Sequence, residues 1–175
     1  TNSQVGAILK DTRGYIWFGT QSGLCRFDGF RMKTFYYINT DDKSLPNNSV
    51  DELQQDYGGN IWVHTSVGYC IYKYDEEQFE RKPEEWLKNI HVQGPPYKLL
   101  IDKDKNMWIA VYGQGLYYHN AKTKNTYLFK FTKKAQPGCL KEGNISKITE
   151  VDGDALITYG DGTICRVNGQ KQKVL

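Results

Sequence analysis

The segment Asp11–Leu24, DTRGYIWFGTQSGL, decides the fold of this chain because it recurs along the sequence. A second copy, DYGGNIWVHTSVGY, covers Asp56–Tyr69, and a third, DKDKNMWIAVYGQGL, covers Asp102–Leu116. A weaker fourth copy, EVDGDALITYGDGT, covers Glu150–Thr163 and has Leu156 where the others have tryptophan. Such a repeat indicates an architecture built from one supersecondary unit that is used several times.

The repeating unit has a nearly constant length and a constant order of parts. Its anchor residues are spaced by 45, 46 and 48 positions and are Trp17, Trp62, Trp108 and Leu156. Each unit predicts four short strands, which in the first unit are QVGAILK, YIWFGT, LCRFD and RMKTFYY. Four antiparallel strands in about 45 residues are typical of a β-propeller blade. We therefore expect an all-β propeller fragment of about four four-stranded blades, at approximately 1–40, 41–90, 91–135 and 136–175.

Two kinds of turn join the strands of a unit. The motif Asp-x-x-Gly, at Asp11–Gly14 and Asp56–Gly59, predicts a tight turn in which Asp accepts hydrogen bonds from backbone amides and Gly adopts a positive φ. Further glycines mark the next turn, at Gly23, Gly68 and Gly115. Strands such as YIWFG and NIWVH are apolar on both faces, as expected for blades that are packed on both sides by neighbouring blades.

The repeated tryptophans have two interpretations. A ring repeated around a propeller can line a platform for sugars, or it can belong to the apolar core between blades. The core is favoured because the tryptophan recurs at one fixed strand position and not in a loop. The helix-like stretch DEEQFERKPEEWLKNI contains Pro83, so we expect one short helical turn at most, near Glu84 to Lys88.

The four cysteines do not indicate a disulfide framework. Cys25, Cys70 and Cys165 occur at the same place in three repeats, and equivalent positions of a radial repeat are too far apart for a bond that needs Cα atoms within about 7 Å. They are interpreted as small buried residues of a core strand. Cys139 is predicted to be a lone thiol in a loop.

The charge and hydropathy patterns exclude several classes of function. The chain has 175 residues and a net charge of +3 with acids and bases interspersed, so we expect no contact with nucleic acid. No apolar run approaches the roughly 20 residues of a membrane span, and no signal peptide is evident. The lysines near the C-terminus are interpreted as a solvated edge and are Lys130, Lys133, Lys134, Lys141, Lys171 and Lys173. The chain begins on the first repeat and ends after the fourth, which predicts a piece of a longer protein.

The combined motif resembles a known family. Asp-x-x-Gly-x-Ile-Trp, with SLPNNSVDELQQD before its second copy and GLCRFDGFRMKTF after its first, resembles the regulatory propeller repeats of Bacteroides-type hybrid two-component sensor histidine kinases. The resemblance covers essentially the whole chain. It implies the N-terminal part of a seven-bladed propeller in a periplasmic sensor domain, with the other blades and the kinase elsewhere in a homodimeric protein. It also implies an oligosaccharide ligand, derived from a polysaccharide, that switches on the genes for using it. The sequence departs from the repeat at His64, Ala110 and Lys105, each in place of glycine.

The candidate ligand-binding residues lie mainly on the turns between second and third strands. In a propeller these turns and the connections between blades open on one face, around the mouth of the channel. Hydroxyl, amide and aromatic groups suit a sugar, although they are also ordinary turn residues. The candidates are Gln21, Ser22, Ser66, Tyr112, Gln114, Tyr159 and Asp161, together with His64 of a second strand. His64 either points into the channel or is packed and bonded to a neighbouring blade.

The sequence predicts binding and no chemistry. We expect no catalytic residue, no metal and no cofactor, because no nucleophile triad, phosphate loop or Cys/His cluster occurs at the required spacing. One alternative is a self-contained four-bladed interaction module, which needs a closing strand or a disulfide staple. Another is a propeller glycosidase or lyase, but only Asp161 and the Asp41–Asp42 loop offer carboxylates at the mouth. A partial ring leaves apolar faces uncovered and predicts self-association or poor solubility.

Overall fold

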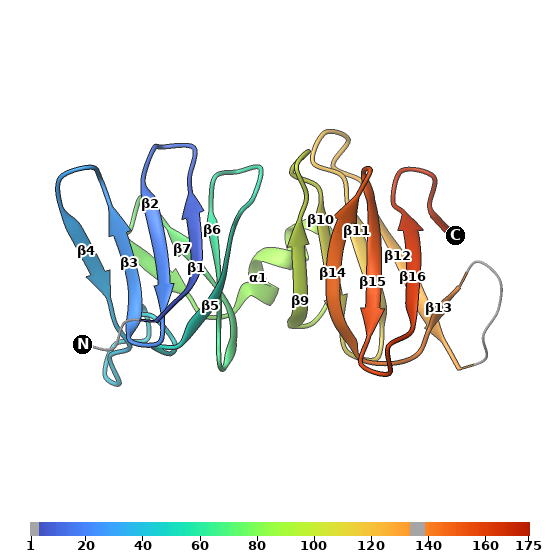
Figure 1. Ribbon diagram of the computed structural model, residues 1–175, viewed down its shortest axis with the longest axis horizontal. Helices are drawn as coiled ribbons and strands as arrows, with labels where there is room; N and C mark the ends of the chain where they lie inside the picture. The colour runs from blue at the N-terminus through green and yellow to red at the C-terminus, as the bar shows by residue number, and fades with distance from the viewer. Residues whose placement is uncertain (1–3, 134–138) are drawn as a thin grey trace. The chain divides into compact units, whose positions relative to one another are not determined.

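The strands of the first half of the chain form two antiparallel sheets. The computed structural model describes residues 4–133 and 139–175, and Figure 1 shows the elements. The first sheet has the order β1 (Val5–Lys10), β2 (Ile16–Thr20), β3 (Gly23–Phe27) and β4 (Met32–Phe35). The second has the order β5 (Val50–Gln55), β6 (Ile61–Thr65), β7 (Gly68–Lys73) and β8 (Gln78–Glu80). The four-stranded meander predicted for each repeat is confirmed in both.

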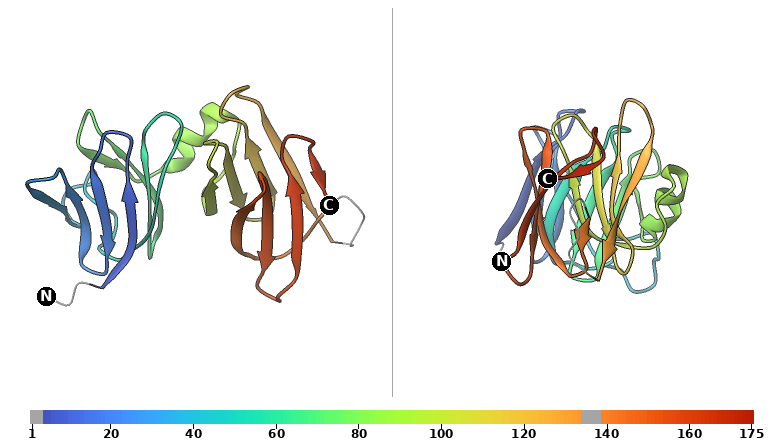
Figure 2. Two further views of the ribbon diagram at one scale, coloured as in Figure 1. Left: turned by 45° about the horizontal axis from the view of Figure 1, so that its top comes forward. Right: turned by 90° about the vertical axis from the view of Figure 1, so that its right-hand side faces the viewer.

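The second half of the chain repeats this plan. The third sheet contains β9 (Pro96–Ile101), β10 (Met107–Val111), β11 (Gly115–His119) and β12 (Thr126–Thr132), and β13 (Leu140–Lys141) joins its edge in parallel to β12. The fourth contains β14 (Ile145–Val151), β15 (Asp154–Tyr159), β16 (Ile164–Asn168) and β17 (Lys173–Val174). Neighbouring strands of each sheet are hydrogen-bonded, and Figure 2 shows the ribbon from two further directions.

The chain divides into two compact units, one before and one after the bond between Pro83 and Glu84. Each unit contains two sheets. The short helix α1 (Pro83–Leu87) continues into a 3₁₀ turn, η1 (Lys88–Ile90). A helical turn is thus present where it was predicted, but the helical segment is longer than the single turn expected. Proline is compatible with the first helical position because its missing N–H would have no partner there.

Within each unit the contact between sheets is concentrated on their first strands. In the first unit β5 packs against β1 and β2, and in the second unit β14 packs against β9. Blades that radiate from a common axis meet in this way, because their first strands are the closest to the axis.

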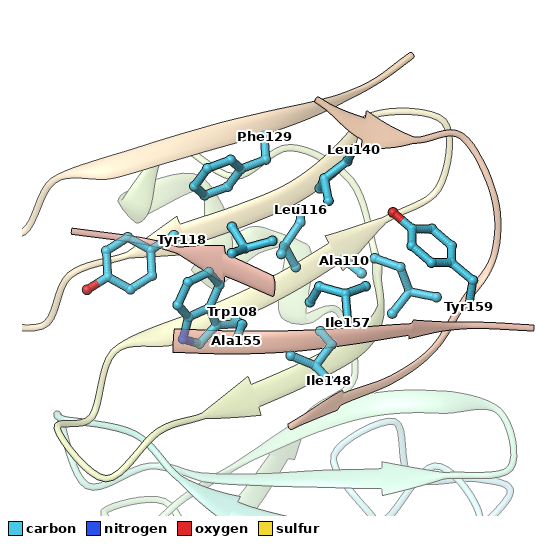
Figure 3. Close-up of a cluster of buried hydrophobic side chains, with 12 residues drawn as sticks. Trp108, Ala110, Leu116, Tyr118, Phe129, Leu140, Ile148, Ala155, Ile157 and Tyr159 are labelled. Atoms are coloured by element: carbon cyan, nitrogen blue, oxygen red, sulfur yellow. The ribbon is translucent and has the colours of Figure 1, made fainter. Parts of the chain in front are cut away.

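The tryptophans belong to the core, as predicted for that position. Trp17 is fully buried in a cluster that includes Val63, Cys70 and Tyr72 of the second sheet. Trp108 is fully buried in a cluster with Ile157 of the fourth sheet (Figure 3). Thus the tryptophan-bearing face of one sheet covers the aliphatic face of the next. Truncation of such a buried ring to alanine typically costs about 3–5 kcal/mol, so these contacts contribute substantially to the packing of the paired sheets.

The Asp-x-x-Gly turn is held by a buried carboxylate. Oδ1 of Asp56 accepts hydrogen bonds from the backbone N of Gly58 and Asn60, at 2.9 and 3.0 Å. Its Oδ2 accepts from the Trp62 indole N–H at 3.0 Å. Asp11 and Asp102 make the same bonds to the indoles of the first and third repeats, at 2.7 and 3.3 Å. The aspartate therefore links the turn to the core. Its bonds to backbone amides were predicted from the sequence, whereas its bond to the indole was not.

The third and fourth copies of this turn depart from the motif. Lys105 occupies the glycine position of the third copy and still has a positive φ of 65°, compared with 91° at Gly14 and 86° at Gly59. In the fourth copy a tighter turn places Asp152 and Gly153 at φ 53° and 82°. Leu156, at the tryptophan position, is only partly buried.

Candidate ligand-binding surface

The predicted surface is organised by hydrogen bonds between turns and inter-sheet connections. In the first unit Gln21 lies in the β2–β3 turn, and its Oε1 accepts from the Ser49 hydroxyl at 2.9 Å. The backbone N of Ser66, in the β6–β7 turn, donates to the Ser49 carbonyl at 3.2 Å. Gln21, Ser22 and Ser66 are exposed. These turns and the β4–β5 connection therefore meet at one end of the strands.

The equivalent surface of the second unit carries an aromatic pair. Tyr112, in the β10–β11 turn, is 65% exposed and stacks on Tyr97 with ring centroids 3.9 Å apart and planes 18° apart. Gln114 of the same turn donates from Nε2 to the Gln93 carbonyl at 2.9 Å and accepts from the Tyr117 hydroxyl at 2.5 Å. Burial raises the pKa of Tyr97, so its hydroxyl stays protonated at neutral pH. The stacked pair offers a rigid apolar ring with polar groups beside it.

The two candidates of the fourth sheet differ from each other in exposure. Asp161 is exposed and pairs with the Lys141 ammonium group, whose hydrogen bond holds the pKa of the carboxyl well below its usual range. Tyr159 is only 3% exposed, so the prediction that this surface presents it is wrong. It ends β15 on the core side of the sheet, and burial raises the pKa of its hydroxyl. The alternation of strand residues between faces directs it inward.

His64 has a partner within its own sheet. Its Nδ1 lies 2.6 Å from Oδ1 of Asp51 on β5, and its ring packs on Tyr69 with centroids 4.4 Å apart. The expectation of a bond to a neighbouring blade is wrong in this respect, because the carboxylate comes from the adjacent strand. The histidine, which stands where the repeat has glycine, thus contacts the Asp51 carboxylate and the Tyr69 ring.

The described residues contain no candidate metal site and no disulfide. In the ranges 4–133 and 139–175 no group of three or more His, Cys, Asp or Glu side chains is placed to hold a metal ion. All four cysteines are free thiols. Cys70 is buried, as interpreted from the sequence, whereas Cys25 and Cys165 are only partly buried.

The structure also contains a hollow that was not predicted from the sequence. It lies in the second unit, between the β11–β12 turn and the β16–β17 turn, with a volume of about 410 Å³. These turns are at the other end of the strands from Tyr112. The prediction considered the turns between second and third strands, the connections between blades and His64, all of them outside this hollow. The signal that could have revealed the hollow is Gly169, which stands where the second repeat has Tyr74.

The sheets and repeated turns define the class of this protein as a β-propeller repeat protein. Residues 1–22 match the family described as two component regulator propeller. Over 98 residues the chain is 33% identical to histidine kinase P4 of Formosa agariphila, which corresponds to 51% of this chain and 7% of that protein. The resemblance to the regulatory propeller repeats of hybrid two-component sensors is confirmed by these similarities.

Solved structures support the same fold. The extracellular domain of the hybrid two component system BT3049 from B. thetaiotaomicron aligns with 100% of this chain and 24% of its own length, at 23% identity and a TM-score of 0.65. The extracellular domain of the system BT4673 from the same organism aligns with 99% of this chain and 25% of its own length, at 17% identity and a TM-score of 0.61. The predicted all-β propeller fold is thus confirmed, and the chain spans about a quarter of these structures. None of the helices in the described residues is long and apolar enough to cross a membrane.

Proposed function

We propose that this chain is part of the periplasmic sensor region of a hybrid two-component histidine kinase that detects an oligosaccharide released from a polysaccharide. The observation that carries this function is the regulator-propeller repeat at residues 1–22, continued as a repeated motif along the chain. The similarity to a histidine kinase over half of the chain supports it. The kinase, the remaining blades and a second copy of the protein would complete the sensor.

The signal in this proposal is a difference in binding free energy. A ligand shifts an equilibrium between two arrangements of a sensor only if it binds one arrangement better than the other. Catalysis by this part of the protein is not required. The exposed Tyr112 ring and the amide groups of the turns supply the stacking and hydrogen bonds that sugar recognition needs.

Deletion of the gene that encodes this chain tests the proposal. The deletion strain and its parent would be grown on a panel of purified polysaccharides, and transcripts would be measured by RNA sequencing. We expect one polysaccharide to induce a set of degradation and uptake genes in the parent and not in the deletion strain. Complementation with the intact gene should restore induction.

The opposite result would contradict the proposal. If every polysaccharide induces the same genes in both strains, the protein does not sense a glycan. Tyr57→Ala is a suitable complementation control, because Tyr57 is a partly exposed tyrosine of a β5–β6 turn, away from the candidate surface.

A further inference from the structure

The hollow of the second unit lies between two turns that connect outer strands. Its wall includes the rings of Tyr118 and Tyr127 on one side and Gly169 on the other. Figure 3 shows the Tyr118 hydroxyl pointing away from the apolar cluster to which its ring belongs. The volume of about 410 Å³ falls within the range of pockets that bind small ligands.

The first unit contains the equivalent position, and strand register identifies it. Arg26 pairs with Trp17 across the sheet and with Lys33 on the next strand. In the third sheet Tyr118 pairs in the same way with Trp108 and with Tyr127. Tyr118 and Tyr127 therefore replace Arg26 and Lys33.

The facing turns correspond as well. Glu77 of the second sheet and Gln172 of the fourth both adopt φ 52° at the end of the turn between the last two strands. Three residues before them are Tyr74 and Gly169. The first unit thus has a glutamate and a tyrosine where the second unit has a glutamine and a glycine.

In the first unit charged and aromatic side chains fill this position. Arg26 donates to the Tyr72 hydroxyl and to Glu77, each at 2.8 Å, and Lys33 also pairs with Glu77. The Tyr74 ring packs on Tyr72 with centroids 5.2 Å apart. The charged groups of Arg26, Lys33 and Glu77 are therefore paired with other groups of the protein.

In the second unit the same position is open, and Lys122 is the one charged residue among the described residues that line it. Gly169 is buried against Tyr118, and a Cβ atom on it would lie 2.5 Å from the ring. The side-chain amides of Asn125, Gln170 and Gln172 are exposed around the hollow and bond to none of the residues that the structure describes. The hollow therefore combines two phenol rings with unused amide donors and acceptors.

Other contacts prepare the Tyr118 hydroxyl to donate. The Asn120 side-chain N–H donates to this hydroxyl oxygen at 3.2 Å, which leaves the phenol proton available. Burial raises the pKa of Tyr118, so the proton is retained at neutral pH. Among the described residues that line the hollow, only Lys122 carries a charge.

We infer that this hollow is a binding site for a neutral, hydroxyl-rich ligand the size of a short saccharide. Paired amides match sugar hydroxyls, which both donate and accept hydrogen bonds, and the exposed face of a tyrosine can stack on sugar C–H groups. A carboxylate or phosphate ligand would favour arginine forks, which the lining lacks. The inference rests on the proposed function for the class of ligand, and it adds a second binding surface at the end of the strands opposite Tyr112.

Ligand titration on the 175-residue chain tests the site. The probes are maltose, cellobiose and xylobiose as neutral disaccharides, and digalacturonic acid as a charged counterpart, followed by saturation-transfer NMR and calorimetry. We expect at least one neutral probe to bind with a dissociation constant of about 10 mM or lower. The charged probe should bind no better than the neutral ones.

Variants then locate the bound sugar. Tyr127→Ala and the pair Gln170→Ala with Gln172→Ala should each weaken binding by about tenfold or more. The matched control is Tyr57→Ala, because Tyr57 and Tyr127 are both 37% exposed. It should leave the dissociation constant unchanged. The glutamine variants are at exposed turn positions, so binding can be tested even if Tyr127→Ala unfolds the sheet.

Each other outcome overturns the inference in a distinguishable way. If Tyr112→Ala abolishes binding and the Tyr127 and glutamine variants do not, the sugar binds the opposite surface and the proposed sensor role stands. If no neutral probe binds at about 10 mM, the site assignment fails, and the transcription experiment alone decides the sensor role.

Discussion

The third and fourth sheets belong to the same unit but hold their first two strands together differently. In the third, the Asp102 carboxylate accepts from the backbone N of Asp104 and Asn106 and from the Trp108 indole. In the fourth, the turn at Asp152 and Gly153 needs no such carboxylate. The Asp154 carboxylate instead accepts from Arg166 at 2.6 Å and from Asn168 at 2.5 Å.

This difference distinguishes the features that every repeat needs, such as the strand register, from the aspartate–tryptophan link, which one repeat lacks. Both sheets keep the same antiparallel register between second and third strands, with Trp108 opposite Tyr118 and Leu156 opposite Arg166. The sheet therefore forms without a carboxylate bound to the turn between its first two strands. The aspartate–tryptophan link instead joins the turn to the core, and its loss in the fourth sheet accompanies a smaller, partly exposed anchor.

The largest effect is expected from removing the anchors themselves. Trp108→Ala should destabilise the chain by about 4 kcal/mol, because it empties a fully buried site and leaves Asp102 without its indole donor. Leu156→Ala should cost about 1–2 kcal/mol, because this side chain is only partly buried. Urea unfolding followed by far-UV circular dichroism measures both. Equal losses would show that the two anchors contribute alike.

Removal of the buried carboxylate should have the next largest effect. Asp102→Ala leaves two backbone amides and the Trp108 indole unsatisfied, at an expected cost of about 2–3 kcal/mol. The control is Asp104→Ala in the same turn, where the side chain is exposed and the expected change is within about 0.5 kcal/mol. A comparable loss in both variants, again by urea unfolding, would contradict a special role for Asp102.

A gain in stability is expected at Lys105. Its φ of 65° is a conformation that glycine adopts without strain, so Lys105→Gly should stabilise the chain by about 1 kcal/mol. Lys103→Gly is the control for removal of a positive charge, because Lys103 is not among the residues with positive φ. It pairs with Glu150 at 2.9 Å, so its replacement should give no gain. Thermal unfolding of the two variants distinguishes relief of strain from a general effect of removing positive charge.

The smallest effect is expected at the exposed pair of Asp161 with Lys141. The pKa of Asp161 is lowered in the folded chain, so its contribution is fully present above the pKa of the unfolded chain, about 3.9, and is lost as the pH falls through the folded value. The wild type should therefore exceed Asp161→Asn in urea midpoint at pH 7, by a margin that shrinks below about pH 4. A margin independent of pH would assign the effect to something other than the carboxylate charge.

The strands could be predicted because their signals are local. Turn glycines and apolar alternation occur within a few residues of one another, so the sequence places β2 and β6 to within one residue of their observed bounds. The burial of Trp17 followed from its fixed place in the repeat. The departure at Lys105 was visible too, although its retained backbone conformation was not.

The site could be predicted only in outline, because it depends on which side chains fill a given space. Tyr159 was assigned to a turn from the sequence, but it is the last residue of β15 and its side chain faces the core. The Asp51 partner of His64 comes from the adjacent strand, so its identity required the register. The hollow beside Gly169 became visible only when its position was matched with Tyr74 of another sheet.

The two faces of a sheet also give the stack a direction. Phe18 and Cys25 on the outward face of the first sheet occupy the positions of Val63 and Cys70, which in the second sheet receive Trp17. This outward face is partly open, with a hollow of about 460 Å³ beside Phe18 and Cys25. The tryptophan-bearing face of one sheet therefore packs on the opposite kind of face of the next sheet. Two faces of the second kind packed on each other would have no tryptophan between them. A further sheet packed on this outward face in the same manner would have to present its tryptophan-bearing face to Phe18 and Cys25, which gives the repeat a direction.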